Sequence, residues 1–239
     1  MVHKNTLADW PDLLTYLPDL ERRQLITRTF RRLDPERQAT VVGAILAEAM
    51  ERGPTHMNIK HIAKRAGVAV GSLYQYFGNR AGLLAFVVSL AVQVTVDQFQ
   101  ACRPQLAALP WRTALEAYLL GGLEWSQMQS GFVQFFAQAA YRGDETALQK
   151  SLVQPVAVVM REIVQDILQA AQARGEVRAD LDIEAAARVI NTWLIVVGDS
   201  QLMPHLNVYF QVTDKKLSFQ RAFNVLLDVL EHGLAGDKQ

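Results

Sequence analysis

The chain has few of the residues that build disulfide-stapled, low-complexity or membrane-spanning folds. It contains one cysteine, Cys102, among 239 residues, which excludes an internal disulfide and a cysteine-cluster metal site. Its 14 glycines and 8 prolines form no linker-like run, so we expect the chain to be folded between its termini. The apolar stretches, such as residues 83–96, are shorter than the roughly twenty residues of a membrane span. The N-terminus lacks a signal-peptide core, and we expect a cytoplasmic protein.

The chain also has no formal net charge, which taken alone argues against a nucleic-acid partner. The charges are nevertheless unevenly distributed along the sequence. Residues 21–80 hold eleven Lys/Arg against five Asp/Glu, a net +6, whereas residues 1–20 carry −2 and residues 81–239 carry −4. A polyanion would therefore bind the segment 21–80.

Strand signals are scarce, because apolar residues recur every three or four positions and no Asn-Gly or Asp-Gly hairpin turn occurs. The sequence therefore predicts an all-α fold. Prolines and glycines between the apolar segments predict short connections between packed helices, and Pro155 predicts a kink. The expected helices are 35–52, 59–66, 69–77, 80–103, 111–129, 131–142, 147–174, 183–202 and 217–234.

Three short helices near the N-terminal end have clear start and stop signals. Asp34 is an N-cap residue followed by Pro35, and Asn58 is a cap residue before the second helix. Gly67 permits a tight turn between the second and third helices. Three helices with this turn are the layout of a DNA-binding helix-turn-helix, whose last helix enters the major groove.

A longer motif coincides with this turn. The segment from Ile62 to Arg80 reads IAKRAGVAVGSLYQYFGNR and is followed by Leu83-Leu84. It resembles the signature of the TetR family of transcriptional regulators, IA..AGVS.GTLY.YF..K..L. The resemblance covers about residues 37–84; beyond them, the chain resembles the family only in length, helix count and apolar character.

The resemblance implies a ligand-responsive DNA-binding regulator, commonly a repressor released from a palindromic operator by a small effector. It implies two parts, the helix-turn-helix domain at 34–82 and a ligand-binding and dimerisation domain at 83–239. They follow an N-terminal extension at 1–33, which the apolar spacing of its residues, and not the resemblance, predicts to be helical. As a homodimer, the protein would place two recognition helices about 34 Å apart on DNA. The predicted DNA contacts are Asn58, Lys60, Ala69, Val70, Ser72, Tyr74, Gln75, Tyr76 and Arg80.

The residue types at these positions suit DNA. The hydroxyls of Tyr74 and Tyr76 can donate to phosphates, Gln75 can pair with an adenine edge, and Arg80 can bind a phosphate. Ala69 departs from the serine common in the family and loses an N-cap that typically contributes about 1 kcal/mol. With Val70 beside it, we expect thymine-methyl contacts and water-mediated recognition to supply more of the specificity.

Residues 111–210 are rich in aromatic residues and methionine. Most such stripes are ordinary core, yet their density favours an apolar pocket for an uncharged hydrophobic or aromatic effector. The candidate lining residues are Tyr118, Trp125, Met128, Phe132, Phe135, Phe136, Met160, Asn191 and Trp193.

The last two expected helices resemble the pair that forms the four-helix dimer interface of the family, although the sequence leaves open which faces meet. Effector binding would shift the long helix after Arg80 and change the separation of the two recognition helices. Trp193 lies with Val189 and Val196 on the first of these helices. The candidate interface residues are Val189, Val196, Phe219, Phe223, Leu226, Leu227 and Leu230.

About thirty-three residues precede the first motif helix, and they are not tail-like. Apolar residues follow helical spacing from Trp10 to Leu17 and again at Ile26, Phe30 and Leu33, which predicts one or two extra amphipathic helices on the core. The arginines at positions 28, 31 and 32 form a basic cluster. It either supplements phosphate binding or is a solvated helix face.

Two other functions are open to an all-α chain. An enzyme is disfavoured, because the sequence offers no nucleophile with a base, phosphate loop or paired catalytic carboxylates. His56 and His61 are five positions apart, off the i, i+4 spacing of a helical metal site, and no metal or cofactor is expected. A helical small-molecule-binding protein without sequence-specific DNA binding is the second alternative; Ala69 favours it weakly, whereas Tyr74, Tyr76 and Arg80 oppose it.

Overall fold

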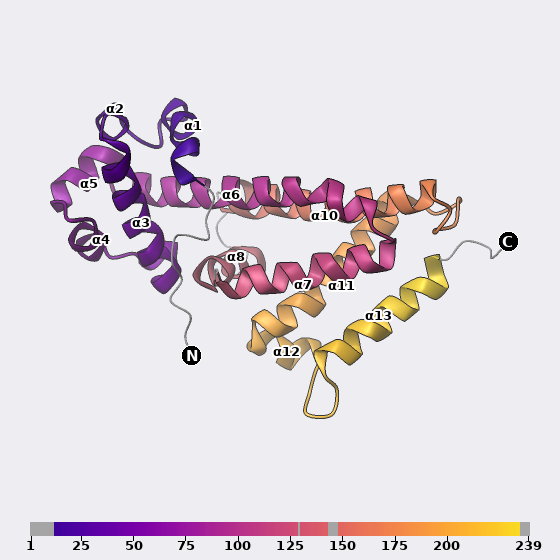
Figure 1. Ribbon diagram of the computed structural model, residues 1–239. Coiled ribbons are helices and arrows are strands. Elements are labelled where there is room, and N and C mark those ends of the chain that lie inside the picture. The colour runs from indigo at the N-terminus through magenta and orange to yellow at the C-terminus, as the bar shows by residue number, and fades with distance from the viewer. Residues whose placement is uncertain (1–11, 129, 143–147, 235–239) are drawn as a thin grey trace. The chain divides into compact units, whose positions relative to one another are not determined.

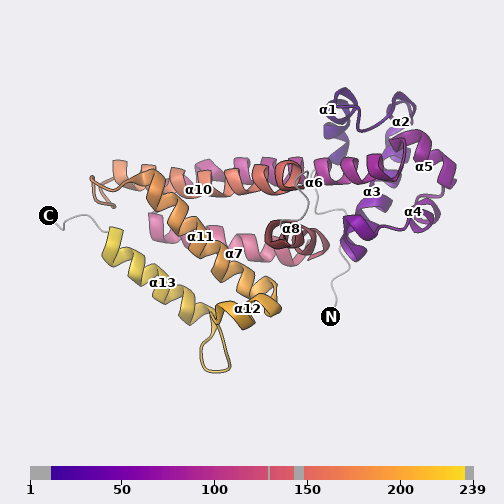
Figure 2. The same cartoon turned by 180° about the vertical axis from the view of Figure 1, so that it is seen from behind.

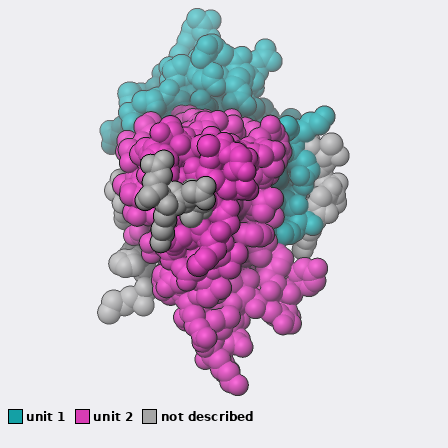
Figure 3. All heavy atoms as spheres, turned by 90° about the vertical axis from the view of Figure 1, so that its right-hand side faces the viewer, with its two compact units in different colours: residues 1–95, 128–155 teal, residues 96–127, 156–239 magenta. Residues whose placement is uncertain are grey.

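The computed structural model describes residues 12–128, 130–142 and 148–234. Every regular element within these ranges is a helix, so the all-α prediction is confirmed. The chain divides into two compact units (Figure 3), unit 1 with residues 1–95 and 128–155 and unit 2 with residues 96–127 and 156–239. This division by packing differs from the expected boundary at 82/83, because the first part of the long helix packs with the helix-turn-helix.

Among the described residues, unit 1 contains the N-terminal extension, the three motif helices, the beginning of a long helix, and two later helical elements (Figure 1). Its elements are η2 (Leu13–Tyr16), α1 (Leu17–Arg22), α2 (Arg28–Arg31), α3 (Pro35–Arg52), η3 (Pro54–His56), α4 (Ile59–Ala66), α5 (Val70–Phe77), the first part of α6 (Arg80–Ala108), α8 (Ser130–Arg142) and η4 (Gln149–Val153).

Unit 2 contains the end of α6 and five further helices, of which α11 packs against both α12 and α13 (Figure 2). A Cβ atom added to Gly198 on α11 would lie 3.4 Å from the Leu119 side chain of α7, so these two helices are also in contact. The five helices are α7 (Trp111–Met128), α10 (Gln154–Ala173), α11 (Ile183–Leu202), α12 (Pro204–Phe210) and α13 (Phe219–Leu234).

The N-terminal extension is part of the core of unit 1, as the apolar spacing predicts. Leu17, Leu20, Ile26 and Phe30 are buried in one cluster with residues of α3 and α5. Burying four large side chains stabilises the docked extension by roughly 1.5–3 kcal/mol for each of them. The expected contribution of Trp10 lies outside the described residues.

Helix ends follow the sequence where the signals are local. The Asp34 side chain accepts a hydrogen bond from the Arg37 N–H at 2.9 Å and caps α3, which ends at Arg52 before Gly53. Gly53 has φ 78°, a value that favours glycine. The start of α11 at Ile183 and its end at Leu202 also agree with the prediction.

Three proline-related predictions differ from the structure. Pro104 does not end its helix: α6 continues past it to Ala108. In this last part of α6, Arg103 binds Asp166 and Leu106 is buried. Before Pro155 the predicted helix 147–174 is divided into a π-helical turn, Gln149–Val153, and α10, which begins at Gln154. Pro204 begins the additional helix α12 rather than acting only as a breaker, a role that its fixed φ favours at a first helical position.

One described helix, α6, is long and apolar enough to cross a membrane by length and composition. Its first half supplies Leu83, Phe86, Val87 and Leu90 to the buried core of unit 1. The apolar character of this half is explained by its burial.

Candidate nucleic-acid interface

The turn between α4 and α5 has the geometry of a helix-turn-helix. Gly67 adopts φ 64° and ψ 35°, the left-handed conformation that glycine tolerates without a steric cost. The Val68 N–H donates to the Ala63 carbonyl at 3.0 Å and closes the end of α4. The Arg37 side chain on α3 donates to the Gly67 carbonyl at 3.2 Å. The turn is therefore held from within and from the first helix.

Behind this turn, the three helices share a tightly packed interior. Ile62 and Leu73 are fully buried, and Ala63 and Ala66 are small residues at buried positions of α4. Phe77 packs against Phe86 of α6 with ring centroids 4.7 Å apart. Close packing of this kind leaves α5 little freedom to move relative to α3 and α6.

The recognition helix α5 presents part of its predicted DNA face to solvent. Ala69 and Gln75 are exposed, Tyr74 is 39% exposed, and Val70 and Ser72 are half-buried. Ala69 is the N-cap residue and no side chain caps the helix, as its departure from serine predicts. These residues can contact a ligand without any rearrangement of the core.

Tyr76 differs from Tyr74 in its surroundings. It is 8% exposed, and its ring lies 5.4 Å from that of Phe30 and 6.3 Å from that of Phe77. Sequence reasoning paired the two tyrosines as phosphate donors. The structure separates them, because the extension covers the side of α5 on which Tyr76 lies.

The remaining predicted contacts lie around the starts of α4 and α6. The Asn58 side chain accepts from the Lys60 N–H at 3.0 Å and caps α4, so the amide oxygen already has a structural role. Lys60 and Arg80 are exposed. The Arg80 side chain donates to the Thr55 carbonyl at 3.1 Å, which holds the guanidinium near η3.

Sequence reasoning missed Glu48, a fully buried carboxylate inside the helix-turn-helix. One of its oxygens, Oε1, accepts from the Asn58 N–H at 3.1 Å, pairs with Arg52 at 3.0 Å and lies 3.5 Å from the Nδ1 atom of His61. The carboxylate therefore joins α3 to the beginning of α4. No sequence signal marks it, because a single acid on an amphipathic helix is normally solvated.

Sequence reasoning also missed Thr27, which contacts the end of the recognition helix. Its N–H donates to the Tyr76 carbonyl at 2.9 Å, and its hydroxyl donates to the Gln75 carbonyl at 2.8 Å. The last carbonyls of a helix have no intrahelical partner, so Thr27 satisfies two of them on α5. A threonine N-cap before α2 was the available signal.

In unit 2, four of the predicted pocket residues lie on α7 and α11, namely Tyr118, Trp125, Asn191 and Trp193. Tyr118 and Asn191 are 8% and 7% exposed, and Trp125 is half-buried with its ring 6.5 Å from that of Phe99. The Tyr118 hydroxyl and the Asn191 Oδ1 atom are buried without a hydrogen-bond partner among the described residues. Burial, together with the Cys102 thiol, raises the pKa of Tyr118, so its hydroxyl stays protonated.

The other predicted pocket residues have different surroundings. Phe132 and Phe135 on α8 are buried in the core of unit 1, with Phe136 packed against it. In unit 2, Met160 on α10 is half-buried and Trp193 on α11 is 41% exposed. The side chain of Met128 lies outside the described residues.

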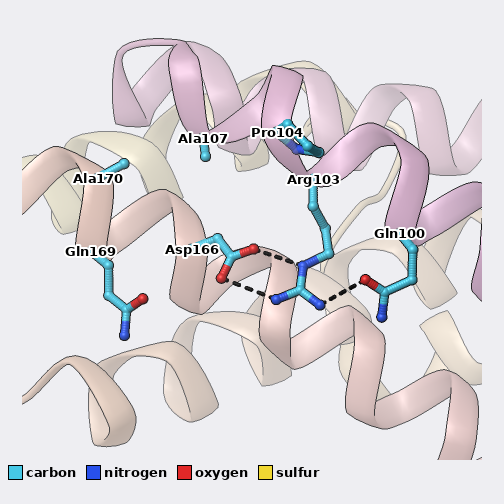
Figure 4. Close-up of a pocket in the computed structure, with 7 residues that line it drawn as sticks. All are labelled: Gln100, Arg103, Pro104, Ala107, Asp166, Gln169 and Ala170. Carbon is cyan, nitrogen blue, oxygen red and sulfur yellow. Dashed lines mark hydrogen bonds and ion pairs between the residues drawn. The ribbon is translucent and has the colours of Figure 1, made fainter.

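A groove of about 590 Å³ lies between the end of α6 and α10 (Figure 4). Within it, Arg103 donates to Asp166 at 2.7 and 3.1 Å and to Glu162 at 2.5 Å, and the hydrogen bond to Asp166 raises the pKa of Arg103. The groove is open and its charges are already paired, so it differs from the expected apolar pocket. Its lining residues are Gln100, Arg103, Pro104, Ala107, Asp166, Gln169 and Ala170.

The last two long helices leave apolar side chains exposed. On α11 these are Val189 at 49% and Trp193 at 41%, and on α13 they are Val225 at 54% and Val229 at 55%. The predicted interface residues Val196, Phe219 and Leu226 are half-buried. Three others are buried inside unit 2 and pack against the chain itself: Phe223, Leu227 and Leu230.

Comparisons with known proteins agree with this architecture. Residues 42–87 match the family model described as bacterial regulatory proteins, tetR family. A TetR family transcriptional regulator from Chloroflexus aurantiacus J-10-FL has a similar structure, with 20% identity, coverage of 88% of this chain and 98% of that chain, and a TM-score of 0.51. No curated protein gives a significant match.

Two further solved structures are similar. The fatty acid degradation regulator FadR from Bacillus halodurans has 19% identity, coverage of 82% of this chain and 96% of that chain, and a TM-score of 0.57. The regulator FadR from Bacillus subtilis, solved in complex with stearoyl-CoA, has 17% identity, coverage of 81% and 97%, and a TM-score of 0.54. These similarities establish the fold of the chain.

The missing N-cap of α5 gives a direct test of the local structure. Ala69→Thr restores a capping hydroxyl, and we expect it to stabilise the first turn by about 1 kcal/mol, which slows hydrogen exchange of the α5 amides about fivefold. Ala69→Val has the same shape without the hydroxyl and is the matched control. Equal exchange rates in the two variants would show that Ala69 is not the N-cap.

Proposed function

Because the chain carries the DNA-binding domain of the bacterial tetR-family regulatory proteins at residues 42–87, we propose that it is a ligand-responsive transcriptional regulator. In this proposal a cytoplasmic homodimer represses transcription from a palindromic operator and is released by a small hydrophobic effector. The observation that carries the proposal is the exposed face of α5, held on a rigid core within a segment of net +6 charge. A helix that projects its side chains from such a core can enter the major groove.

DNA contact would divide between phosphates and bases. Lys60, Tyr74 and Arg80 are exposed polar groups suited to phosphate oxygens. Gln75 is the exposed side chain of α5 best suited to a base edge, since an amide can pair with adenine in two places. Ala69 and Val70 offer apolar surface to a thymine methyl.

Dimerisation would use the apolar residues that α11 and α13 leave exposed. Val189, Trp193, Val225 and Val229 are about half exposed, and large apolar side chains grouped on the surface mark interaction sites. A two-fold symmetric dimer buries the same patch on both subunits. In this arrangement, Phe223, Leu227 and Leu230 support the interface from inside the chain.

The effector would bind in unit 2 near Tyr118 and Asn191. Their buried, unpartnered oxygen atoms are costly unless a ligand or water satisfies them. The surrounding side chains are apolar, including Phe99 6.4 Å from Tyr118 between ring centroids, which favours an uncharged ligand with polar groups for the two oxygens. The FadR structure with stearoyl-CoA supports the same fold as a host for a largely apolar ligand.

A helical small-molecule-binding protein without sequence-specific DNA binding is the second candidate, favoured by the uncapped start of α5. The two proposals differ in one observable. The regulator selects a short duplex from genomic fragments, and the binding protein selects none.

The first test is genomic-fragment selection with the purified protein, followed by gel shift of the recovered site. We expect Tyr74→Phe to weaken binding about fivefold, because an exposed hydroxyl contact to phosphate contributes about 1 kcal/mol. Tyr76→Phe removes the same atom from the buried side and is the matched control, expected to stay within about twofold of the wild type. The absence of any enriched site at low salt would favour the second candidate.

The dimer prediction concerns Trp193 on α11. A charge in the centre of an apolar interface costs several kcal/mol, so we expect Trp193→Glu to sediment as a monomer at micromolar concentration. Val208→Glu introduces the same charge at a 77% exposed position of α12 and should leave the dimer intact. A dimeric Trp193→Glu protein would refute this interface.

The effector prediction uses the unpartnered hydroxyl of Tyr118. Tyr118→Phe removes a buried polar atom without a partner, so we expect unchanged or slightly higher thermal stability. Operator binding should be retained, whereas release by an effector, found by screening uncharged apolar compounds, should be weakened at least tenfold. Leu120→Ala, which alters an exposed residue of the same helix, is the control. Normal release of the Tyr118→Phe protein would remove this residue from the effector site.

A further inference from the structure

The arginines of the N-terminal extension fall into two groups. Arg22 and Arg23 pair with Asp19 at 3.0 and 3.7 Å, and Arg31 lies 3.4 Å from Glu21. By contrast, the exposed side chains at positions 28 and 32 have no acidic partner and no hydrogen bond among the residues that the structure describes. These two cations are therefore free to bind an external anion.

The position of Arg28 is set by its neighbour in the chain. Thr27 donates hydrogen bonds to the carbonyls of Gln75 and Tyr76 at the end of α5, and consecutive Cα atoms are about 3.8 Å apart. Arg28 therefore follows directly in the chain after a residue that contacts the C-terminal end of the recognition helix. Figure 1 shows α2 beside α5. Arg32 follows four positions later, on the same side of the helical turn.

The backbone that carries both arginines is held at several points. Phe30 is fully buried, with its ring 5.3 Å from that of Phe77. The buried Gln38 side chain of α3 donates to the carbonyls of Phe30 and Arg31 at 3.2 and 3.0 Å. A four-residue helix has little stability alone, so these contacts keep α2 in place and preorganise the two cations.

We propose that Arg28 and Arg32 form an accessory DNA contact that binds backbone phosphates flanking the base pairs read by α5. The inference rests on the proposed function and extends the DNA-binding surface into the N-terminal extension. A guanidinium binds phosphate with up to two parallel hydrogen bonds. The contact carries no base information; it raises affinity, fixes the register of α5 in the groove and increases the salt dependence of binding.

A purely structural role gives a different result. The C-terminal end of a helix is favourable for a positive charge, so Arg28 beside the end of α5 would stabilise that helix without touching DNA. Loss of Arg28 would then lower thermal stability and leave the salt dependence of DNA binding unchanged.

The test compares two double variants of the full-length protein. R28Q/R32Q removes the free cations, and R22Q/R23Q removes the same charge from the arginines paired with Asp19. Binding to the duplex recovered by genomic selection, with about ten base pairs of flanking DNA on each side, is measured by fluorescence anisotropy over a range of salt concentrations. Thermal unfolding of all three proteins reports any effect on stability.

We expect R28Q/R32Q to weaken binding at least tenfold near physiological salt. The slope of log K against log salt should fall by about 1 for each phosphate that the variant no longer binds, which is up to about 4 in a dimer. The R22Q/R23Q slope should stay within about 1 of the wild type. On a duplex trimmed to the selected palindrome, R28Q/R32Q and the wild type should bind alike.

Three outcomes overturn the inference and leave the proposed function standing. Equal slopes for R28Q/R32Q and the wild type on the flanked duplex exclude the contact, and a fall in thermal stability with unchanged slopes assigns the arginines a structural role. Equal losses in both double variants show a general charge effect. Failure of the wild-type protein to select any site overturns the proposed function itself, and the accessory contact with it. This result is distinguishable from the other three, in which the wild-type protein still binds its selected site.

Discussion

The helix-turn-helix of unit 1 depends on the fixed position of one short helix. The recognition helix α5 has eight residues and no side-chain N-cap, and a helix of that length is only marginally stable in water. Its order comes from tertiary contacts: the left-handed Gly67 before it, the buried Leu73 and Phe77 within it, and Thr27 at its last carbonyls. The extension is therefore a structural component of the helix-turn-helix, because it supplies Thr27.

How much the sequence predicts depends on whether a signal is local. Caps and turn residues act within a few positions, so the sequence alone predicts the roles of Asp34, Asn58 and Gly67 correctly. The different exposures of Tyr74 and Tyr76 depend on Phe30, more than forty positions earlier. The burial of Glu48 depends in the same way on groups contributed by other elements.

Unit 2 illustrates a second limit of sequence reasoning. Apolar residues at helical spacing predict helices but do not distinguish the interior of one chain from a surface between two chains. On α13, Leu227 and Leu230 are buried, whereas the nearby Val225 and Val229 are about half exposed. Only the packing of α13 against the rest of unit 2 separates these two faces.

The junction between α5 and α6 explains how a signal in the proposed regulator would reach the recognition helix. The Asn79 side chain accepts from the Gly82 N–H at 2.9 Å in the first turn of α6. A Cβ atom at Gly82 would collide with the Phe77 carbonyl, so only glycine permits this approach. Phe77 and Phe86 also pack across the junction.

These contacts oblige α5 and the first turns of α6 to move as one body, since a close-packed interface has few alternative arrangements. The same helix α6 continues without a break for 29 residues and contributes its later residues to unit 2. In the proposed regulator, an effector that displaces this helix would therefore reorient the recognition helix as a rigid element. It would do so without unfolding the domain and without any direct contact with its DNA-facing residues.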